Sequence, residues 1–271
     1  MKRDFFSLPA DILANRQLIV KLAYNDFRVR YAGSYFGIFW AFVQPVITIL
    51  VYWFVFSVGF RQSMAGLNIP FVLYLVAGIV PWFFFQDSLI GGTNALLEYN
   101  YLVKKVVFNI RILPVVKLVS AGIVHSFFVL FTLLLYLLYG KFPGLYALQL
   151  VYYSACCFAL SLSVCYMTCA VVPFFRDLTQ MIQILLQVGV WLTPIMWVAD
   201  DALAGHPVIH MILKLNPVYY IVSGYRDSLI LHRPFWAETG WTLYFWSFTI
   251  GCFCLGTVIF ARLKPHFADV L

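Results

Sequence analysis

Six apolar runs dominate the chain, separated by connections that carry most of its polar and charged residues. A helix needs about 20 predominantly apolar residues to cross the hydrocarbon core of a bilayer. Each run approaches or exceeds that length. The pattern therefore predicts an all-α polytopic membrane protein with six transmembrane helices, at residues 38–60, 69–92, 115–139, 146–173, 178–198 and 241–261.

The fifth run and the segment after it differ from the others. Pro194 interrupts the fifth run, and Pro207, Pro217 and Pro234 divide residues 199–240 into semi-apolar pieces. Because proline ends or kinks a helix, these pieces are too short to span a bilayer. We therefore expect outer re-entrant helices between spans five and six.

Lys and Arg residues are distributed unevenly between the two sides of the predicted membrane. If both termini lie in the cytoplasm, 13 of the 18 basic residues fall on the inner side. Cytoplasmic segments of membrane proteins carry such an excess. The bias predicts an N-in, C-in orientation, with five basic residues in outer segments, namely Arg61, Lys141, Lys214, Arg226 and Arg233.

The composition agrees with a single membrane domain. Of 271 residues, 63% are hydrophobic and 11% are charged, whereas a soluble domain is about half apolar and a quarter charged. Because the basic residues flank apolar runs, the net charge of +7 favours membrane lipids over nucleic acid as a partner. We expect one domain over residues 1–271, with a cytoplasmic or interfacial segment at 1–37, six spans within 38–261 and a cytoplasmic tail at 262–271.

An amphipathic segment precedes the first span. Residues 11–31 mix apolar side chains with basic ones, and Arg28 and Arg30 lie near the end of the segment. This pattern is typical of a helix that lies in the membrane interface. We also expect no cleavable signal peptide, because the first apolar run is too long for the core of one.

A second amphipathic segment, ALLEYNYLVKKVVF at residues 95–108, lies between spans two and three. A simple connection between neighbouring helices needs only about 2 to 8 residues. The segment is longer than that, so we expect a short cytoplasmic helix that presents a surface. Its polar side chains are Glu98, Asn100, Lys104 and Lys105.

Polar stripes run along two of the predicted spans. In the fifth span, the three glutamines and Trp191 fall on one helical face; in the first, polar and aromatic residues recur at every fourth position. Such a face can line a path for a hydroxyl-rich substrate, or it can form hydrogen bonds between helices. The sequence leaves both explanations open. The residues are Gln180, Gln183, Gln187 and Trp191, and Trp40, Gln44, Thr48 and Tyr52.

Other polar residues within or beside the spans favour structural explanations. His125 lacks an apparent acidic partner at its depth, which favours a buried histidine with satisfied hydrogen bonds over a proton relay. Arg226 and Asp227 could anchor a lipid headgroup or a pyrophosphate, although a surface ion pair is the commoner case. Span four has a face of small residues that is typical of helix packing, formed by Ser154, Cys157, Ser161, Cys165 and Thr168.

No motif indicates an enzyme. The chain lacks the G-x-x-x-x-G-K-[ST] phosphate loop, so we expect no ATP hydrolysis by this chain. His206 and His210 lack the glutamate of H-E-x-x-H, which disfavours a metal site. Asp200 and Asp201 form an isolated acidic pair, a weak indication of a membrane glycosyltransferase or acyltransferase. We therefore expect neither a catalytic residue nor a bound metal.

Five segments of the chain resemble, in the same order, the membrane permease of ABC-2 type transporters that export polysaccharides such as O-antigen, capsule and teichoic acid. The resemblance covers nearly the whole chain. It departs from the family at Phe108, Asn109, Ile110 and Arg111, where related sequences tend to read F-P-R. The segments are RYAGSYFGIFWAFVQPVITILVYWFVFS, AGIVPWFFF, NYLVKKVVFNIRILP, FFRDLTQMIQILLQVGVWLTPIMW and NPVYYIVSGYRDSLI.

The resemblance implies a homodimer of permeases in the bacterial inner membrane, with two cytosolic ABC ATPase subunits. ATP and Mg would be bound by those subunits, with no cofactor in this chain, and the substrate would be a lipid-linked glycan. A permease for a drug or a small lipid shares the same architecture and is the alternative.

The resemblance also implies roles for the segments described above. Spans one and five would line the channel with the two polar stripes. The helix between spans two and three would couple to the ATPase through Glu98, Asn100, Lys104 and Lys105. The helix before span one would be a gate helix carrying Arg28 and Arg30. The outer gate would include Asn216 and Arg226.

Overall fold

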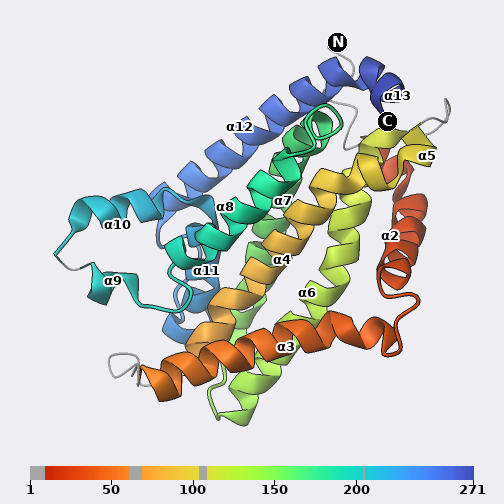
Figure 1. Ribbon diagram of the computed structural model, residues 1–271. Coiled ribbons are helices and arrows are strands. Elements are labelled where there is room, and N and C mark those ends of the chain that lie inside the picture. The colour runs from red at the N-terminus through yellow and green to blue at the C-terminus, as the bar shows by residue number, and fades with distance from the viewer. Residues whose placement is uncertain (1–9, 61–68, 104–108, 204) are drawn as a thin grey trace.

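The computed structural model describes residues 10–60, 69–103, 109–203 and 205–271. Within these ranges, all regular secondary structure is helical (Figure 1), which confirms the predicted all-α class. In the described part of the chain, five helical segments are long and apolar enough to cross a membrane: Gly37–Gly59, Phe71–Glu98, Ile110–Leu138, Gly144–Val171 and Thr239–His266. The remaining predicted run forms a shorter apolar helix, Leu178–Leu192.

The helices fall into three groups by length. The long ones are α4 (Phe71–Glu98), α6 (Leu113–Leu138), α7 (Gln149–Val171) and α12 (Thr239–Leu263). Those of 8 to 15 residues are α2 (Arg16–Arg30), α3 (Trp40–Trp53), α8 (Leu178–Leu192), α10 (Pro207–Lys214) and α11 (Pro217–Arg226). The shortest elements are α5 (Asn100–Val103), α9 (Ala199–Ala202), α13 (Phe267–Val270), η1 (Gly37–Phe39), η2 (Phe54–Gly59), η3 (Ile110–Ile112), η4 (Gly144–Leu148), η5 (Asp227–Leu231) and η6 (Lys264–His266).

Helix α4 forms the centre of the bundle. It packs against α3, α6, α7, α8 and α11, whereas α12 packs on α7, and α2 runs beside α6 (Figure 1). In its most apolar stretch, 78% of the residues are buried within the protein. Because α4 touches so many partners, its position determines where the other helices lie.

The predicted small-residue face of span four is confirmed as a packing surface between α7 and α4. A Cβ atom added at Gly92 would lie 2.3 Å from Cys165 Sγ, so the two helices approach too closely for any larger residue there. The hydroxyls of Thr93 and Thr168 are hydrogen-bonded at 2.7 Å, and the Cys165 thiol donates to Ser88 O. Small residues permit this approach.

The boundaries of two helices differ from the predicted spans. α4 continues to Glu98, six residues beyond the predicted end of span two. α8 stops at Leu192, whereas the fifth span was predicted to reach residue 198. Thr193 precedes Pro194 and is extended, with φ −81° and ψ 125°, because the proline ring disfavours helical backbone in the residue before it.

The prolines between residues 199 and 231 act as the sequence predicts. α10 and α11 each start with a proline, Pro207 and Pro217, in the first helical turn, where its missing N–H costs no hydrogen bond. The resulting helices have four, eight and ten residues. They are too short to span a bilayer.

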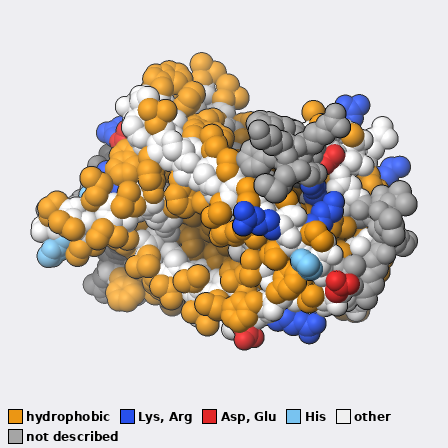
Figure 2. All heavy atoms as spheres, turned by 90° about the horizontal axis from the view of Figure 1, so that it is seen from above, with side chains coloured by type: hydrophobic (Ala, Val, Ile, Leu, Met, Phe, Trp, Pro, Cys, Tyr) orange, Lys and Arg blue, Asp and Glu red, His pale blue; other side chains and the backbone are white. Residues whose placement is uncertain are grey.

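One end of the bundle carries α5 and α13, and the connection between α6 and α7 lies at the opposite end (Figure 1). Seen onto the end with α5 and α13, Lys and Arg side chains are interspersed with hydrophobic ones (Figure 2). This is the end that the distribution of basic residues predicts to be cytoplasmic.

Candidate functional site

The two predicted polar stripes lie on α3 and α8 and touch at one described contact. We call the exposed faces that carry the two stripes the α3–α8 surface. Tyr52 of α3 and Trp191 of α8 make an edge-to-face contact, with ring centroids 6.4 Å apart. α8 buries Ile182 and Leu186 on its other face, against the core. This leaves the amides of the α3–α8 surface exposed, at Gln44, Gln180, Gln183 and Gln187.

The three glutamines of α8 are not held by other helices of the same chain. Within the described ranges, the side chains of Gln180, Gln183 and Gln187 take part in no hydrogen bond. An unpaired amide in hydrocarbon costs several kcal/mol, on the order of 2 to 7. Among the described residues, no helix of the same chain satisfies these amides, which favours water, a ligand or a second chain as their partner.

The α3 stripe lines a cavity of about 350 Å³ between α3 and α4. The α4 wall contributes Trp82, Gln86 and Asp87, which do not belong to the predicted stripes. Two adjacent polar residues inside an apolar run were the signal that could have identified them. The α3 wall contributes Trp40, Gln44, Thr48 and Tyr52.

A buried ion cluster joins α2, α4 and α6 at the end of the bundle that carries α5. Lys117 is only 4% exposed; its Nζ atom contacts the carboxylates of Asp26 and Glu98, and the Tyr99 hydroxyl donates to Asp26 at 2.9 Å. We call these four residues the Lys117 cluster. Charges this deeply buried are tolerated because they are paired.

Arg30, one of the two predicted gate residues, extends this cluster toward the cavity. Its guanidinium donates to both carboxylate oxygens of Asp87 at 2.8 Å and approaches Asp26 at 3.4 Å. Arg28, the other predicted gate residue, stays exposed, with its guanidinium 5.9 Å from the Tyr24 ring. Only Arg30 therefore ties the end of α2 to the wall of the cavity.

The electrostatics of the Lys117 cluster favour a charged Asp26. Burial raises the pKa of this carboxyl, but the hydrogen bond and positive charge of Lys117 outweigh it, so the pKa of Asp26 lies below its ordinary value. The cluster is therefore an ion pair, and it couples the position of α2 to the C-terminal end of α4.

The predicted coupling residues lie beside this cluster or beyond the described ranges. Glu98 is half exposed and pairs with Lys117, and Asn100 begins α5 on the surface. Lys104 and Lys105 fall outside the residues that the structure describes. After them, the Asn109 side chain accepts a hydrogen bond from the Arg111 backbone N–H and caps η3, so the departure from F-P-R still starts a helical turn.

Asn216 and Arg226, the predicted outer-gate residues, hold the segment that follows α8. Asn216 caps α11 and donates to the Thr193 hydroxyl at 3.0 Å. Arg226 is 8% exposed and donates to the carbonyls of Pro194 and Ile195 at 2.6 and 2.7 Å. A surface ion pair with Asp227 was thus the wrong expectation, because a guanidinium that satisfies non-helical carbonyls is more stable buried among them.

The remaining polar candidates have structural partners. His125 is buried, as expected, and its Nε2 lies 3.1 Å from both the Ser154 and the Tyr225 hydroxyls. The expectation of a satisfied histidine holds for this nitrogen only, because Nδ1 has no hydrogen-bond partner among the described residues. Among the described residues, no three His, Cys, Asp or Glu side chains converge as metal ligands would. The side chains of Asp200 and Asp201 lie outside that description.

Known proteins are similar to this chain in sequence over most of its length. The chain is 26% identical to the O-antigen export system permease protein RfbA of Myxococcus xanthus over 83% of its own length and 85% of the relative's. It is 25% identical to a protein of the same name from Klebsiella pneumoniae, over 94% of its length and 95% of the relative's. The sequence profile described as ABC-2 type transporter matches residues 17–230. The chain therefore belongs to the ABC-2 type transporter family.

Proposed function

We propose that this chain is the membrane permease of an ABC exporter that moves a lipid-linked polysaccharide of the O-antigen, capsule or teichoic acid type. The observation that carries the proposal is the exposed α3–α8 surface, which combines amides that lack hydrogen-bond partners among the described residues with aromatic rings. Amides form hydrogen bonds with hydroxyl groups, and aromatic rings cover the apolar faces of sugars. The similar proteins from Myxococcus xanthus and Klebsiella pneumoniae, both named as O-antigen export permeases, support this substrate class.

The proposed topology has six spans, with both termini in the cytoplasm of a bacterial cell and the chain in the inner membrane. α8, with the extended segment after it, supplies the short fifth span, and α9, α10, α11 and η5 form the outer re-entrant region. The excess of basic residues on the predicted inner side supports this orientation.

The proposed assembly is a homodimer that places two α3–α8 surfaces face to face around a channel. Only 11% of the most apolar stretch of Gly37–Gly59 is buried within one chain, which leaves room for lipid on one side and a second copy on the other. Cysteine pairs introduced at Gln183 and Gln187 should form cross-links between copies; failure at every glutamine of the surface would exclude this interface.

The proposed energy source is a pair of cytosolic ABC ATPase subunits, which bind ATP and Mg. They would dock on the segment after α4, through Glu98, Asn100, Lys104 and Lys105. Reversing both lysine charges, Lys104→Glu with Lys105→Glu, should abolish export and stimulation of the ATPase while membrane insertion stays normal. Unchanged ATPase stimulation in the inserted variant would refute the docking site.

Depletion of the chain tests the function itself. Cells that lack it should accumulate lipid-linked glycan on the inner leaflet and lose surface polysaccharide. Normal surface polysaccharide in a clean deletion strain would refute the proposal. ATPase turnover in proteoliposomes distinguishes a glycan exporter from the alternative, a permease for a drug or a small lipid. In the alternative, the turnover would respond to small hydrophobic compounds and not to the glycan.

A further inference from the structure

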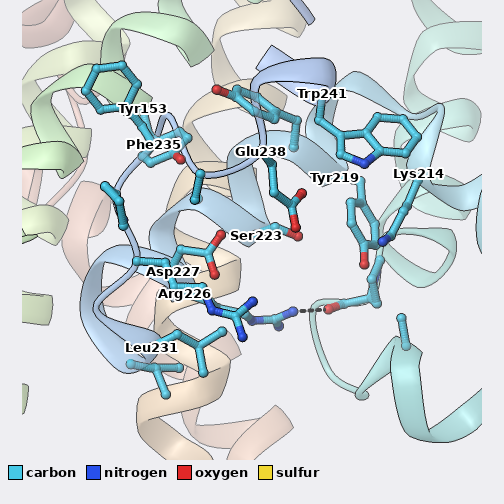
Figure 3. Close-up of a pocket in the computed structure, with 18 of the residues that line it drawn as sticks. Tyr153, Lys214, Tyr219, Ser223, Arg226, Asp227, Leu231, Phe235, Glu238 and Trp241 are labelled. Carbon is cyan, nitrogen blue, oxygen red and sulfur yellow. Dashed lines mark hydrogen bonds between the residues drawn. The ribbon is translucent and has the colours of Figure 1, made fainter. Parts of the chain in front are cut away.

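A second cavity lies away from the α3–α8 surface, among α10, α11, η5 and the first turn of α12 (Figure 3). Its volume of about 520 Å³ falls within the range of small-ligand sites, roughly 300 to 1,000 Å³. The proposed channel surface and the proposed ATPase-docking segment do not include this cavity. Five charged side chains line it, among them Arg226 of the predicted outer gate.

The walls of the cavity combine aromatic rings with hydrogen-bonding groups. In Figure 3, the carboxylates of Asp227 and Glu238 and the hydroxyl of Ser223 surround the same space, with the rings of Tyr219 and Trp241 beside it. An aromatic face next to acceptors and donors is the arrangement that suits a pyranose ring, which has apolar C–H faces and a rim of hydroxyls.

The charges of the cavity nearly cancel, which disfavours an anion as its ligand. Lys214 and Arg233 are matched by Asp227 and Glu238. The fifth charge, on Arg226, is already engaged by two carbonyls and lies 3.7 Å above the Tyr74 ring. A phosphate would meet two carboxylates here, and like charges repel.

The floor of the cavity is closely packed. Arg226 lies against Gly78, where an added Cβ atom would be 2.9 Å from its Nη2 atom. Gly224 likewise leaves room for the Tyr153 ring, 2.0 Å from where its Cβ would be. Arg226 thereby fixes α11 against α4 and the end of α8, so the groups around the cavity are held in place before any ligand binds.

We propose that this cavity binds a short, neutral saccharide, as a secondary site for the glycan outside the channel. The site deepens the proposed function and rests on it for the source of the saccharide. Trp241 and Tyr219 stack on the sugar ring, and Asp227, Glu238 and Ser223 bind its hydroxyls.

Saturation-transfer NMR on the full-length chain in nanodiscs tests the site. The probe is a set of oligosaccharides released by mild acid from the surface polysaccharide of the host cell. Magnetisation should pass to the sugar ring protons. Trp241→Ala and Glu238→Gln should each weaken binding at least tenfold. Both residues lie near the surface at the start of α12, so the chain should still fold, as gel filtration and thermal unfolding will check.

Trp236→Ala is the matched control. Trp236 lies in the same segment and is 64% exposed, but it does not line the cavity, so the variant should bind the saccharide as the parent does. Absence of transfer in the parent chain, or equal transfer in all variants, would overturn the proposal. So would displacement of the saccharide by inorganic pyrophosphate at equal concentration, because that result identifies an anion site.

The result of the saccharide-binding test can be distinguished from the result of the test of the export function. If deletion of the chain traps glycan inside the cell but the saccharide does not bind, the cavity proposal fails and the export function stands. If the saccharide binds but the deletion strain exports normally, the site stands and the export function fails.

Discussion

Helices α3 and α4 are both apolar and long enough, with their flanking turns, to span a membrane, but their surroundings are opposite. In the most apolar stretch of each, 78% of α4 residues are buried and only 11% of those in the α3 segment. The α3 segment nevertheless has the higher mean hydropathy. In this pair the more apolar segment is therefore the less buried one, and α4 makes its close contacts through small and polar residues such as Gly92, Thr93 and Ser88.

The largest expected effect comes from breaking the ion cluster at the end of α4. Lys117→Met removes the buried cation that pairs with Asp26 and Glu98, and it leaves Asp26 with the more distant Arg30, at 3.4 Å, as its cation. Removing one partner of a buried pair costs about 3 to 5 kcal/mol. Thermal unfolding in detergent and protease sensitivity of α2 measure the loss. Lys21→Met, at an exposed lysine of α2, is the control and should change neither. Equal midpoints for both variants would contradict the role of the cluster.

The same cluster predicts a pH dependence. The pKa of Asp26 is lowered in the folded chain from its ordinary value of 3.8. The carboxylate therefore contributes stability above that value, and the contribution is lost as the pH falls through the lower, folded pKa. The stability difference between the parent and Lys117→Met should shrink below about pH 4. A difference that stays constant down to acidic pH would show that Asp26 is not the partner.

Alanine substitutions at two neighbouring glycines of α4 test how closely this helix packs against α7. Gly92→Ala forces a methyl group against Cys165 and should destabilise the protein by about 1 to 3 kcal/mol. Gly91→Ala meets nothing closer than 3.8 Å and should be neutral or stabilising by up to about 1 kcal/mol, since alanine favours helix. Thermal unfolding in detergent separates the two. Equal effects would mean that α4 and α7 are not in close contact.

A smaller effect is expected where α3 meets α8. Tyr52→Leu removes the edge-to-face contact with Trp191, which is worth about 0.5 to 1.5 kcal/mol. A double-mutant cycle with Trp191→Leu isolates the coupling energy from the effect of each substitution. Trp53→Leu, at the next and exposed position of α3, supplies the control and should show no coupling to Trp191.

The least effect on stability is expected on the exposed face of α8. Gln183→Leu and Gln187→Leu should change stability by no more than about 0.5 kcal/mol, yet both should lower export, because they remove amides offered to the substrate. Met181→Leu, at an exposed apolar position of the same helix, should leave export unchanged. Normal export with leucine at both glutamines would exclude this face from the channel.

Much of the fold could be predicted from local sequence. The apolar runs correspond to the long helices, the prolines start α10 and α11, and Pro194 ends α8. The small-residue face of α7 predicted its packing. These features depend on residues close together in the chain, where helical periodicity and proline geometry act directly.

The pairings of the site could not be predicted in this way. Asp26 and Lys117 are 91 residues apart, and no local pattern joins them. The burial of Arg226 could not be predicted, because its partners are the backbone carbonyls of Pro194 and Ile195. Every residue has a backbone carbonyl, so the sequence does not show which ones an arginine will contact. The sequence predicts the polar stripe of α8 but not whether it is exposed. The structure shows that it is, because Ile182 and Leu186, on the opposite face, are the residues that α8 buries.

The shortness of α8, as the proposed fifth span, has a consequence for the lipid around it. Its 15 residues extend about 22 Å at about 1.5 Å per residue, whereas the hydrocarbon core is about 30 Å thick. A helix shorter than the bilayer draws the two leaflets together locally. We therefore expect a thinned membrane beside the glutamines, in which lipid headgroups and their water approach from both sides. The hydrocarbon layer that a hydrophilic polymer has to cross would then be thinner at this position.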